Sequence, residues 1–294
     1  MKAILTRALC LCLILCLLMP ALTACAGRKE SVYLNSFTRV YDASDALLDL
    51  QSYTYNEFGQ VLTFTSYERK VINTYDDQGN QLTSRTETLK DGSPVTVTET
   101  RMTYDKRGNM LTTGSYRLEG DTETHLGSVT LEYDEQDRLL RETGAQTVTE
   151  YVYAAHDGYT STETLVETGE VVCVITETRN EAGKLTSRVT DRRDTGDTET
   201  YTATYSEAGD ILTEVYAMNG AELETYRYEY DTHGDHTHLA RVITLREDVE
   251  MERTVYGYDD NHNRTQAVVC SPNGTVKRTY IYEYTLTEIK ALGK

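Results

Sequence analysis

The sequence contains no tryptophan and only 3 prolines, and beyond its N-terminal segment no stretch places apolar residues at helical spacing over several turns. The missing spacing argues against a helical fold, because a helix packs through an apolar stripe that recurs every three or four residues. The chain is instead rich in threonine and contains 23 tyrosines. Both residue types are typical of β-strands. The composition therefore predicts an all-β protein.

Basic residues are also in short supply, since 29 Lys and Arg stand against 47 Asp and Glu, a net charge of −18. This balance argues against a nucleic-acid partner, because phosphate groups need positively charged side chains. It argues equally against attraction to anionic lipid headgroups. We interpret the acidic residues as a solvated surface that keeps the protein soluble.

Residues 1–24 have the features of a secretory signal. Lys2 and Arg7 precede an apolar run over residues 8–22, which is too short for a permanent membrane span. The run ends in Leu22-Thr-Ala-Cys25, which resembles a bacterial lipobox. That resemblance implies cleavage before Cys25 and attachment of lipid to its thiol.

With Cys25 lipidated, residues 25–31 would form a short tether and residues 32–294 the folded domain. More than one acyl chain makes membrane anchoring stable. We therefore expect an extracytoplasmic protein, lipid-anchored to the bacterial cell membrane, or to the outer membrane where the cell has two. The alternative is an ordinary secretory signal cut after Ala24 or Ala26.

The cysteines do not predict a disulfide framework. Three of the six leave with the signal and Cys25 is taken by lipid, so only Cys173 and Cys270 remain. Export would allow them to pair. However, they lie several repeats apart, and units of a repeat array contact mainly their neighbours. We favour two buried thiols that pack as small apolar groups, with pairing as the open alternative.

A short unit recurs along the chain, with Tyr and Asp ending one strand and Gly and Leu starting the next. Met102-Thr-Tyr-Asp-Lys-Arg-Gly-Asn-Met-Leu-Thr112 is its clearest copy, and Gly108 suits the left-handed backbone of a tight turn. Other copies are Tyr55–Leu62, Tyr75–Leu82 and Tyr205–Leu212, with less regular ones at Tyr133–Leu140, Tyr230–Gly234 and Tyr258–His262.

A second family of turns, for example Asp91-Gly92, Asn219-Gly220 and Asn273-Gly274, alternates with the first. Two alternating turn families predict a long antiparallel up-and-down meander of about twenty strands. The stretch 42–50 fits either a short helix or a further copy of the unit.

Tyrosine recurs at every second residue before these turns, as in Tyr226/Tyr228/Tyr230. Alternation puts such residues on one face and the intervening Thr and Glu on the other. A wide sheet with one apolar face should twist until that face turns inward, as a coiled sheet or a large barrel-like shell. The polar face offers no lipid-compatible band, which argues against an outer-membrane barrel.

The pattern Tyr-x-Tyr-Asp-x-x-Gly-x-x-Leu, spread from Tyr41 to Tyr284, resembles the YD repeats of the RHS family. The resemblance implies a β-ribbon that spirals into a shell, as in polymorphic toxins, toxin-complex shells and cell-surface adhesion proteins, with a role in carbohydrate binding. The chain lacks the Asp-Pro-x-Gly signature of the self-cleaving core found in the toxins, and it ends soon after Tyr284. We therefore do not expect a toxin-delivery role.

Two groups of residues are candidates for ligand contact. The first is the stripe of Tyr226, Tyr228, Tyr230, Tyr256 and Tyr258, whose rings could stack on sugars; the alternative is that they pack as the core of the curled sheet. The second is His233, His236 and His238, with His262 one repeat on. Imidazoles at this spacing can chelate a transition metal, although the spacing matches no specific motif and turn histidines are usually solvated.

We predict neither a resident metal nor a cofactor. The acidic pairs in the turns, such as Asp76-Asp77, fit Asx-turn chemistry better than a calcium loop. Ser161 lies near His156-Asp157, but no nucleophile-elbow turn accompanies them. We therefore expect no enzyme.

The sequence as a whole predicts a lipid-anchored surface scaffold that binds a glycan or another surface protein. A purely structural spacer or shell component is the alternative, and a carbohydrate-active enzyme is the third.

Overall fold

The computed structural model describes residues 29–233 and 236–290, and of Lys29 and His233 it describes only the backbone. The predicted signal, residues 1–24, and the predicted lipid attachment site Cys25 lie outside the described residues. No helix in the described part is long and apolar enough to cross a membrane. The first strand begins at Lys29, so the folded part starts inside the segment 25–31 that we expected to be a tether.

The described residues form one antiparallel meander of twenty strands, as the sequence predicted, and they also contain a single 3-10 turn. The elements are β1 (Lys29–Asp42), β2 (Leu47–Tyr55), β3 (Val61–Thr65), β4 (Arg69–Tyr75), β5 (Gln81–Lys90), β6 (Ser93–Tyr104), β7 (Met110–Glu119), β8 (Thr122–Tyr133), β9 (Leu139–Thr143), β10 (Thr147–Tyr153), η2 (Ala155–Asp157), β11 (Tyr159–Leu165), β12 (Val171–Arg179), β13 (Leu185–Arg192), β14 (Asp197–Tyr205), β15 (Ile211–Met218), β16 (Ala221–His233), β17 (His236–Arg246), β18 (Val249–Tyr258), β19 (Arg264–Cys270) and β20 (Val276–Lys290).

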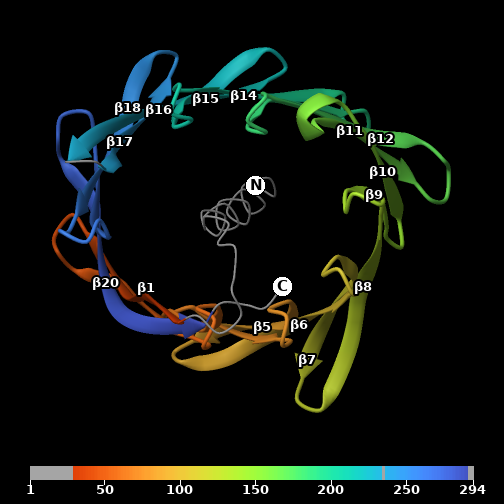
Figure 1. Ribbon diagram of the computed structural model, residues 1–294, viewed down its shortest axis with the longest axis horizontal. Coiled ribbons are helices and arrows are strands. Elements are labelled where there is room, and N and C mark those ends of the chain that lie inside the picture. Colours follow the sequence, from red (N-terminus) through yellow and green to blue (C-terminus); the bar gives the residue numbers. More distant parts are fainter. Residues whose placement is uncertain (1–28, 234–235, 291–294) are drawn as a thin grey trace.

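The meander closes into a barrel, because β1 pairs with β20 (Figure 1). The pairing runs from Lys29 opposite Lys290 to Asp42 opposite Arg278, with one irregularity near Ser36. Of the two shapes that the sequence allowed, the coiled sheet and the barrel-like shell, the barrel is therefore the one that forms. Closure removes both free sheet edges, which would otherwise expose unpaired backbone groups.

The stretch 42–50 is a turn followed by a strand rather than a helix. Asp42 accepts hydrogen bonds from the amides of Ser44 and Ala46 through its Oδ1 atom, and β2 starts at Leu47. Successive turns of a meander alternate between its two ends. The turn between β1 and β2 therefore lies at one rim of the barrel, and the turn between β2 and β3, which follows Tyr55, lies at the opposite rim. We call the rim that carries the turns after β2, β4, β6 and the later even-numbered strands the YD rim.

Most of the described YD-rim turns are held by an Asp or Asn side chain. In the turn after β4, the Oδ1 atom of Asp76 accepts the amides of Gln78 and Asn80 at 2.9 and 2.8 Å. Asp105, Asp134 and Asp259 bind their own turns in the same way, and so do Asn56 and Asn180. The Asx-turn interpretation of these acidic residues is confirmed.

The two faces of the barrel wall differ as the alternation predicted. Following the cross-strand pairs around the ring puts the paired tyrosines, for example Tyr53, Tyr201 and Tyr256, on one face throughout. Of the eleven described residues other than glycine that are buried, all but Ile243 and Leu245 lie on this tyrosine face. Side chains on the inner face of a barrel converge and cover one another, whereas outward ones diverge. The tyrosine face is therefore the inner face.

In most even-numbered strands, the last tyrosine forms a hydrogen bond that connects the YD-rim turn after it to the preceding YD-rim turn. Tyr104, at the end of β6, donates its hydroxyl to the carbonyl oxygen of Gln81 at the start of β5, at 2.9 Å. The same bond recurs as Tyr55 to Asn35, Tyr75 to Val61, Tyr153 to Leu139, Tyr205 to Leu185, Tyr230 to Ile211 and Tyr258 to Leu239. These bonds explain why the repeated unit places Tyr directly before the turn.

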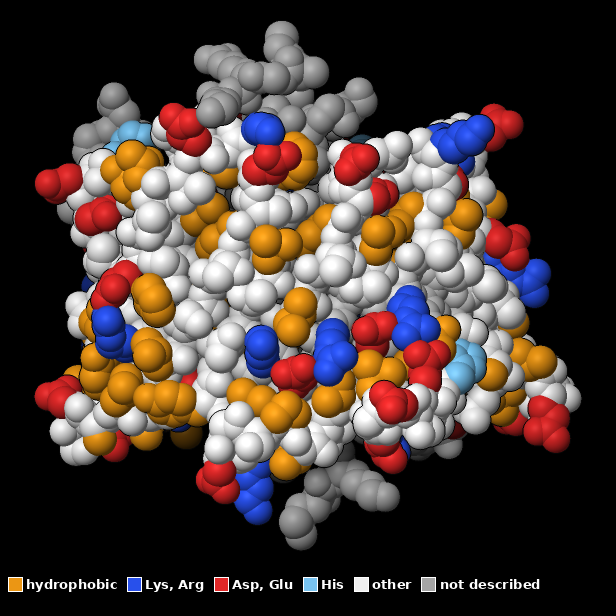
Figure 2. All heavy atoms as spheres, turned by 90° about the horizontal axis from the view of Figure 1, so that it is seen from below, with side chains coloured by type: hydrophobic (Ala, Val, Ile, Leu, Met, Phe, Trp, Pro, Cys, Tyr) orange, Lys and Arg blue, Asp and Glu red, His pale blue; other side chains and the backbone are white. Residues whose placement is uncertain are grey.

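The outer face is built from threonines and ion pairs. Thr103 and Thr112 hydrogen-bond across β6 and β7 at 2.6 Å, and three further threonine pairs repeat this contact. Arg101 binds Glu99 and Glu123 at 2.6 and 2.5 Å and lies over the ring of Tyr116. Figure 2 shows charges of both signs interspersed with apolar and uncharged side chains on the side of the barrel that it displays.

We predict that Tyr104→Phe lowers the free energy of unfolding by about 1–2 kcal/mol, because the carbonyl oxygen of Gln81 loses its donor. Denaturant-induced unfolding followed by circular dichroism measures this change. Tyr67→Phe, at a tyrosine that is 51% exposed, is the control and should cost less. Equal midpoints for the two variants would contradict a role for the hydroxyl bonds.

A second prediction concerns acid stability. Burial opposes the shift, but hydrogen bonds from the Asn80 side chain and from backbone amides outweigh it and lower the pKa of Asp76; similar bonds lower the pKa of Asp105, Asp134 and Asp259. A carboxyl whose pKa is lowered on folding stabilises the protein above the ordinary pKa of about 3.9 and loses that contribution as the pH falls through the folded value.

Replacing these four residues by Asn, which already serves at positions 56 and 180, should keep the turns and flatten the fall in melting temperature below about pH 4. Thermal unfolding between pH 2 and pH 7 tests this. A decline as steep as that of the unmodified protein would show that other groups set the acid limit.

Candidate functional site

Three of the five tyrosines predicted to contact a ligand are engaged in holding the barrel together. Tyr230 and Tyr258 donate their hydroxyls to backbone carbonyl oxygens at 2.9 and 3.0 Å. The guanidinium of Arg264 lies 4.3 Å from the ring centre of Tyr256, and Ala267 pairs with Tyr256 from the next strand. For these three positions, the packing interpretation describes the structure better than the ligand interpretation.

The other two tyrosines belong to a group of polar aromatic side chains on the inner face of β14, β15 and β16. Tyr228 donates its hydroxyl to the carboxylate of Glu214, which also accepts the hydroxyl of Tyr201 at 2.7 Å. The ring of Tyr216 lies between the rings of Tyr201 and Tyr226, with centroid distances of 5.1 and 5.8 Å. We call Tyr201, Glu214, Tyr216, Tyr226 and Tyr228 the tyrosine cluster.

The hydroxyls of this cluster stay protonated at physiological pH. Burial and the hydrogen bonds to Glu214 raise the pKa of Tyr201 and Tyr228 above the ordinary value, and burial together with the nearby Glu214 raises the pKa of Tyr216 to about 12. Tyr216 is also 38% exposed. Tyr216 is therefore the exposed ring of the cluster, and the hydroxyls of its neighbours Tyr201 and Tyr226 are fixed by hydrogen bonds to Glu214 and Glu224.

Next to the cluster, a buried carboxylate is held by two arginines. Glu177 has a side chain that is only 1% exposed, and it accepts hydrogen bonds from Arg188 Nε at 2.7 Å and from Arg179 Nη2 at 3.0 Å. Arg188 pairs across strands with Tyr201, so the two groups adjoin. Arg179 stands where other repeats have the tyrosine of the hydroxyl-to-carbonyl bond. This repeat thus replaces that bond by an ion pair.

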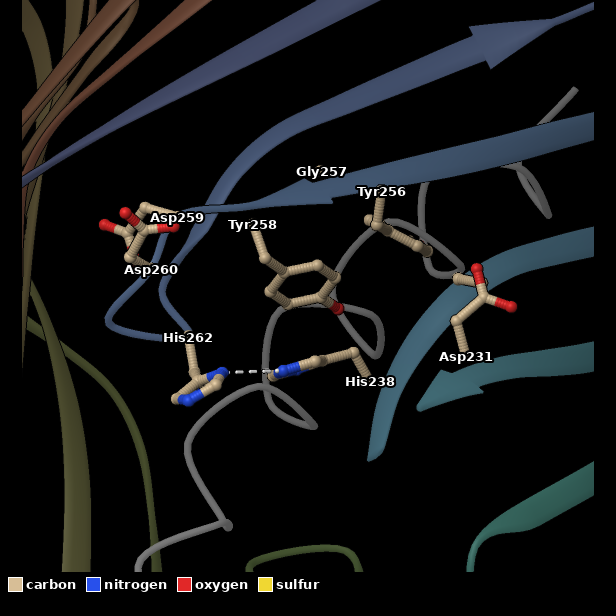
Figure 3. Close-up of a pocket in the computed structure, with 9 residues that line it drawn as sticks. Asp231, His238, Tyr256, Gly257, Tyr258, Asp259, Asp260 and His262 are labelled. Carbon is tan, nitrogen blue, oxygen red and sulfur yellow. Dashed lines mark hydrogen bonds between the residues drawn. The ribbon is translucent and has the colours of Figure 1, made fainter. Parts of the chain in front are cut away.

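The second predicted group, the histidines, comes together in part. His236 and His238 lie on β17, and the turn between β18 and β19 brings His262 to them. The Nε2 atom of His238 is 2.9 Å from the Nδ1 atom of His262 (Figure 3). The His238 ring also packs against Tyr258 at 4.5 Å. The side chain of His233 lies outside the described residues.

His238 and His262 border a cavity of about 470 Å³ at the YD rim, which is lined also by Asp231, Asp259 and Asp260 (Figure 3). Asp259 is occupied by its own turn, where it accepts two backbone amides. Among residues 29–233 and 236–290, no three or more His, Cys, Asp or Glu side chains already converge as a metal site. Two imidazole nitrogens do face each other.

Cys173 and Cys270, the two cysteines in the described part of the chain, are free. Cys173 is buried, and burial raises the pKa of its thiol, as expected for a cysteine that packs as an apolar group. Cys270 is only partly buried, so the prediction of two buried thiols is wrong for this residue. The two lie on β12 and β19, which are not neighbouring strands.

Sequence reasoning missed Tyr201, Glu214 and Tyr216. Tyr201 does show the period of two, in Tyr201-Thr-Ala-Thr-Tyr205, and could have been included. Glu214 and Tyr216 lie after a turn, where the pattern of tyrosines preceding turns gives no signal. Their role depends on which residues lie opposite them, namely Ala203 and Tyr201.

No protein-family model and no curated protein matches the chain. Among solved structures, a crystal structure of TcdB2-TccC3-Cdc42 is 13% identical with a TM-score of 0.33, over 81% of this chain and 17% of that one. A porin-like protein from Bacteroides uniformis is 16% identical with a TM-score of 0.40, over 69% of this chain and 95% of that one. A porin-like protein from Bacteroides vulgatus is 10% identical with a TM-score of 0.33, over 86% and 99%.

This chain thus spans 17% of the length of the toxin-complex chain that it matches. TM-scores below 0.5 at such identities give no basis for transferring a function. The resemblance to YD repeats stays a prediction that rests on the motif residues themselves.

Proposed function

We propose that this protein is a carbohydrate-binding scaffold, held outside the bacterial cell membrane by a lipid on Cys25. The observation that supports binding is the tyrosine cluster, which joins aromatic rings to a carboxylate on the inner face of β14–β16. The anchor rests on the lipobox-like Leu22-Thr-Ala-Cys25. The proposal assigns the protein no catalytic step.

The chemistry of the cluster suits a sugar. A sugar ring has apolar C–H faces that stack on aromatic rings and hydroxyls at its edge that bond to carboxylates and guanidinium groups. Tyr216 offers the accessible ring, while Glu224 and Arg246, joined at 3.1 Å, lie next to Tyr226 and supply polar partners. Because hydrogen bonds already fix Tyr201 and Tyr228, little side-chain freedom would be lost on binding.

The alternative is a spacer or shell component without a ligand of its own. This alternative is favoured by the recurring tyrosine-to-carbonyl bonds, in which hydroxyl groups serve the wall of the barrel. The two functions differ in what the exposed Tyr216 does. A binding scaffold needs its ring, and a spacer does not.

We predict that the full-length protein in detergent is retained specifically on a glycan array, and that Tyr216→Ala weakens retention about tenfold, the equivalent of about 1.4 kcal/mol of stacking. Tyr116→Ala removes a tyrosine of the outer face and is the matched control, expected to leave retention unchanged. Circular dichroism confirms that both variants keep the fold. Absence of retention on any glycan, or an equal loss in the two variants, would favour the spacer.

A further inference from the structure

Two neighbouring repeats depart from the common turn at the same place on the YD rim. The first departure is the hairpin of β16 and β17, which continues past Tyr230 instead of reversing there. Its strands stay paired through Asp231 opposite His238 and onward to His233 opposite His236. The extension carries His236 and His238 beyond the point at which the other YD-rim hairpins turn.

The second departure is His262, in the turn between β18 and β19. It has a φ of 65°, and in the turns after β2, β4, β6, β12 and β14 the same position is Gly59, Gly79, Gly108, Gly183 and Gly209. Asp137 is a further non-glycine residue there. A left-handed backbone costs a non-glycine residue roughly 1–2 kcal/mol, so a histidine here is more readily explained by its side chain than by its backbone.

The two departures bring His236, His238 and His262 into contact. The ring centroid of His262 is 3.8 Å from that of His236 and 4.9 Å from that of His238, and nitrogens of His238 and His262 are 2.9 Å apart (Figure 3). Such a pair holds one proton between two imidazole nitrogens. Two ligand nitrogens on a tetrahedral zinc ion would be roughly 3.3 Å apart at zinc–nitrogen distances of about 2.0–2.1 Å. The rings therefore need to separate by only a few tenths of an ångström.

We propose that His238 and His262 bind a divalent transition-metal cation such as Zn²⁺ at the YD rim. Zn²⁺ takes the place of the shared proton, which moves to the other nitrogen of the ring that carried it. His236, which packs against His262, turns its ring to become the third ligand. Asp231 and Asp260, which line the same cavity, add negative charge that attracts the cation. Imidazole ligands favour zinc over calcium or magnesium, which prefer oxygen.

The site has a physical consequence for the barrel. The bound ion would join the β16–β17 hairpin to the β18–β19 turn, beside the bond from Tyr258 to Leu239. A ligand that binds only the folded protein raises its melting temperature. The site therefore predicts a metal-dependent stabilisation that does not depend on any glycan.

The test is a Zn²⁺ titration of the full-length protein, prepared without a histidine tag and with Cys270→Ser, because Cys270 is a partly exposed thiol. Isothermal titration calorimetry should give one Zn²⁺ per chain, and thermal unfolding should show a higher melting temperature with Zn²⁺ than without it. His238→Ala and His262→Gly should each weaken binding more than tenfold and abolish the thermal shift. His262→Gly installs the residue of the neighbouring turns, so it should fold at least as well as the unmodified protein.

His125→Ala is the matched control, since this histidine packs against Tyr116 on the outer face, and it should leave Zn²⁺ binding unchanged. Ca²⁺ in place of Zn²⁺ should not bind at this site. The proposal is overturned if no Zn²⁺ binds, if His262→Gly binds it as tightly as the unmodified protein, or if Ca²⁺ gives the same titration. A failed glycan array would leave these results unaffected.

Discussion

The pairing of β1 with β20 is the constraint on which the rest of the barrel depends, because the wall is a single sheet with no second layer to support it. Only eleven of the described residues other than glycine are buried, and none of the large ones is below 2% exposed as a whole residue. Burial of apolar surface therefore contributes less here than in a domain with a packed core. More of the stability therefore comes from hydrogen bonds: those between strands, those from tyrosine hydroxyls to carbonyl oxygens, and those between threonine pairs. Because the sheet is closed, it also has no free edge strand.

The repeated unit makes the frame, and its departures make the candidate sites. Where the unit is intact, as at Tyr104-Asp105, the tyrosine hydroxyl and the Oδ1 atom of the aspartate both bind backbone groups. Where it changes, side chains become available for other contacts: Arg179 replaces the tyrosine, and His262 replaces the glycine. Both the tyrosine cluster and the histidine cavity adjoin such places. Local conflict with an otherwise regular pattern is a recognised mark of function.

Much of the fold could be predicted from the sequence, because a period of two and alternating turns are local properties. The strand number, the shared tyrosine face and the Asx turns followed from these. The closure of the barrel did not follow from local properties, since it depends on the accumulated twist and coil of twenty strands. The partners of Tyr228 and Tyr258 could not be predicted either, because they depend on cross-strand register, which shifts by one residue at most YD-rim turns. For the same reason the sequence places His262 only one repeat on from the other histidines and does not predict its contact with His238.

Amide hydrogen–deuterium exchange tests the closed barrel most directly. Edge strands of an open sheet exchange quickly, because one side of each strand faces water, whereas paired strands are protected. The closed ring predicts that amides of β1 and β20 exchange as slowly as those of the internal strands β6 and β7. Rapid exchange throughout both terminal strands, with the rest of the sheet protected, would contradict the closure and with it the assignment of an inner face.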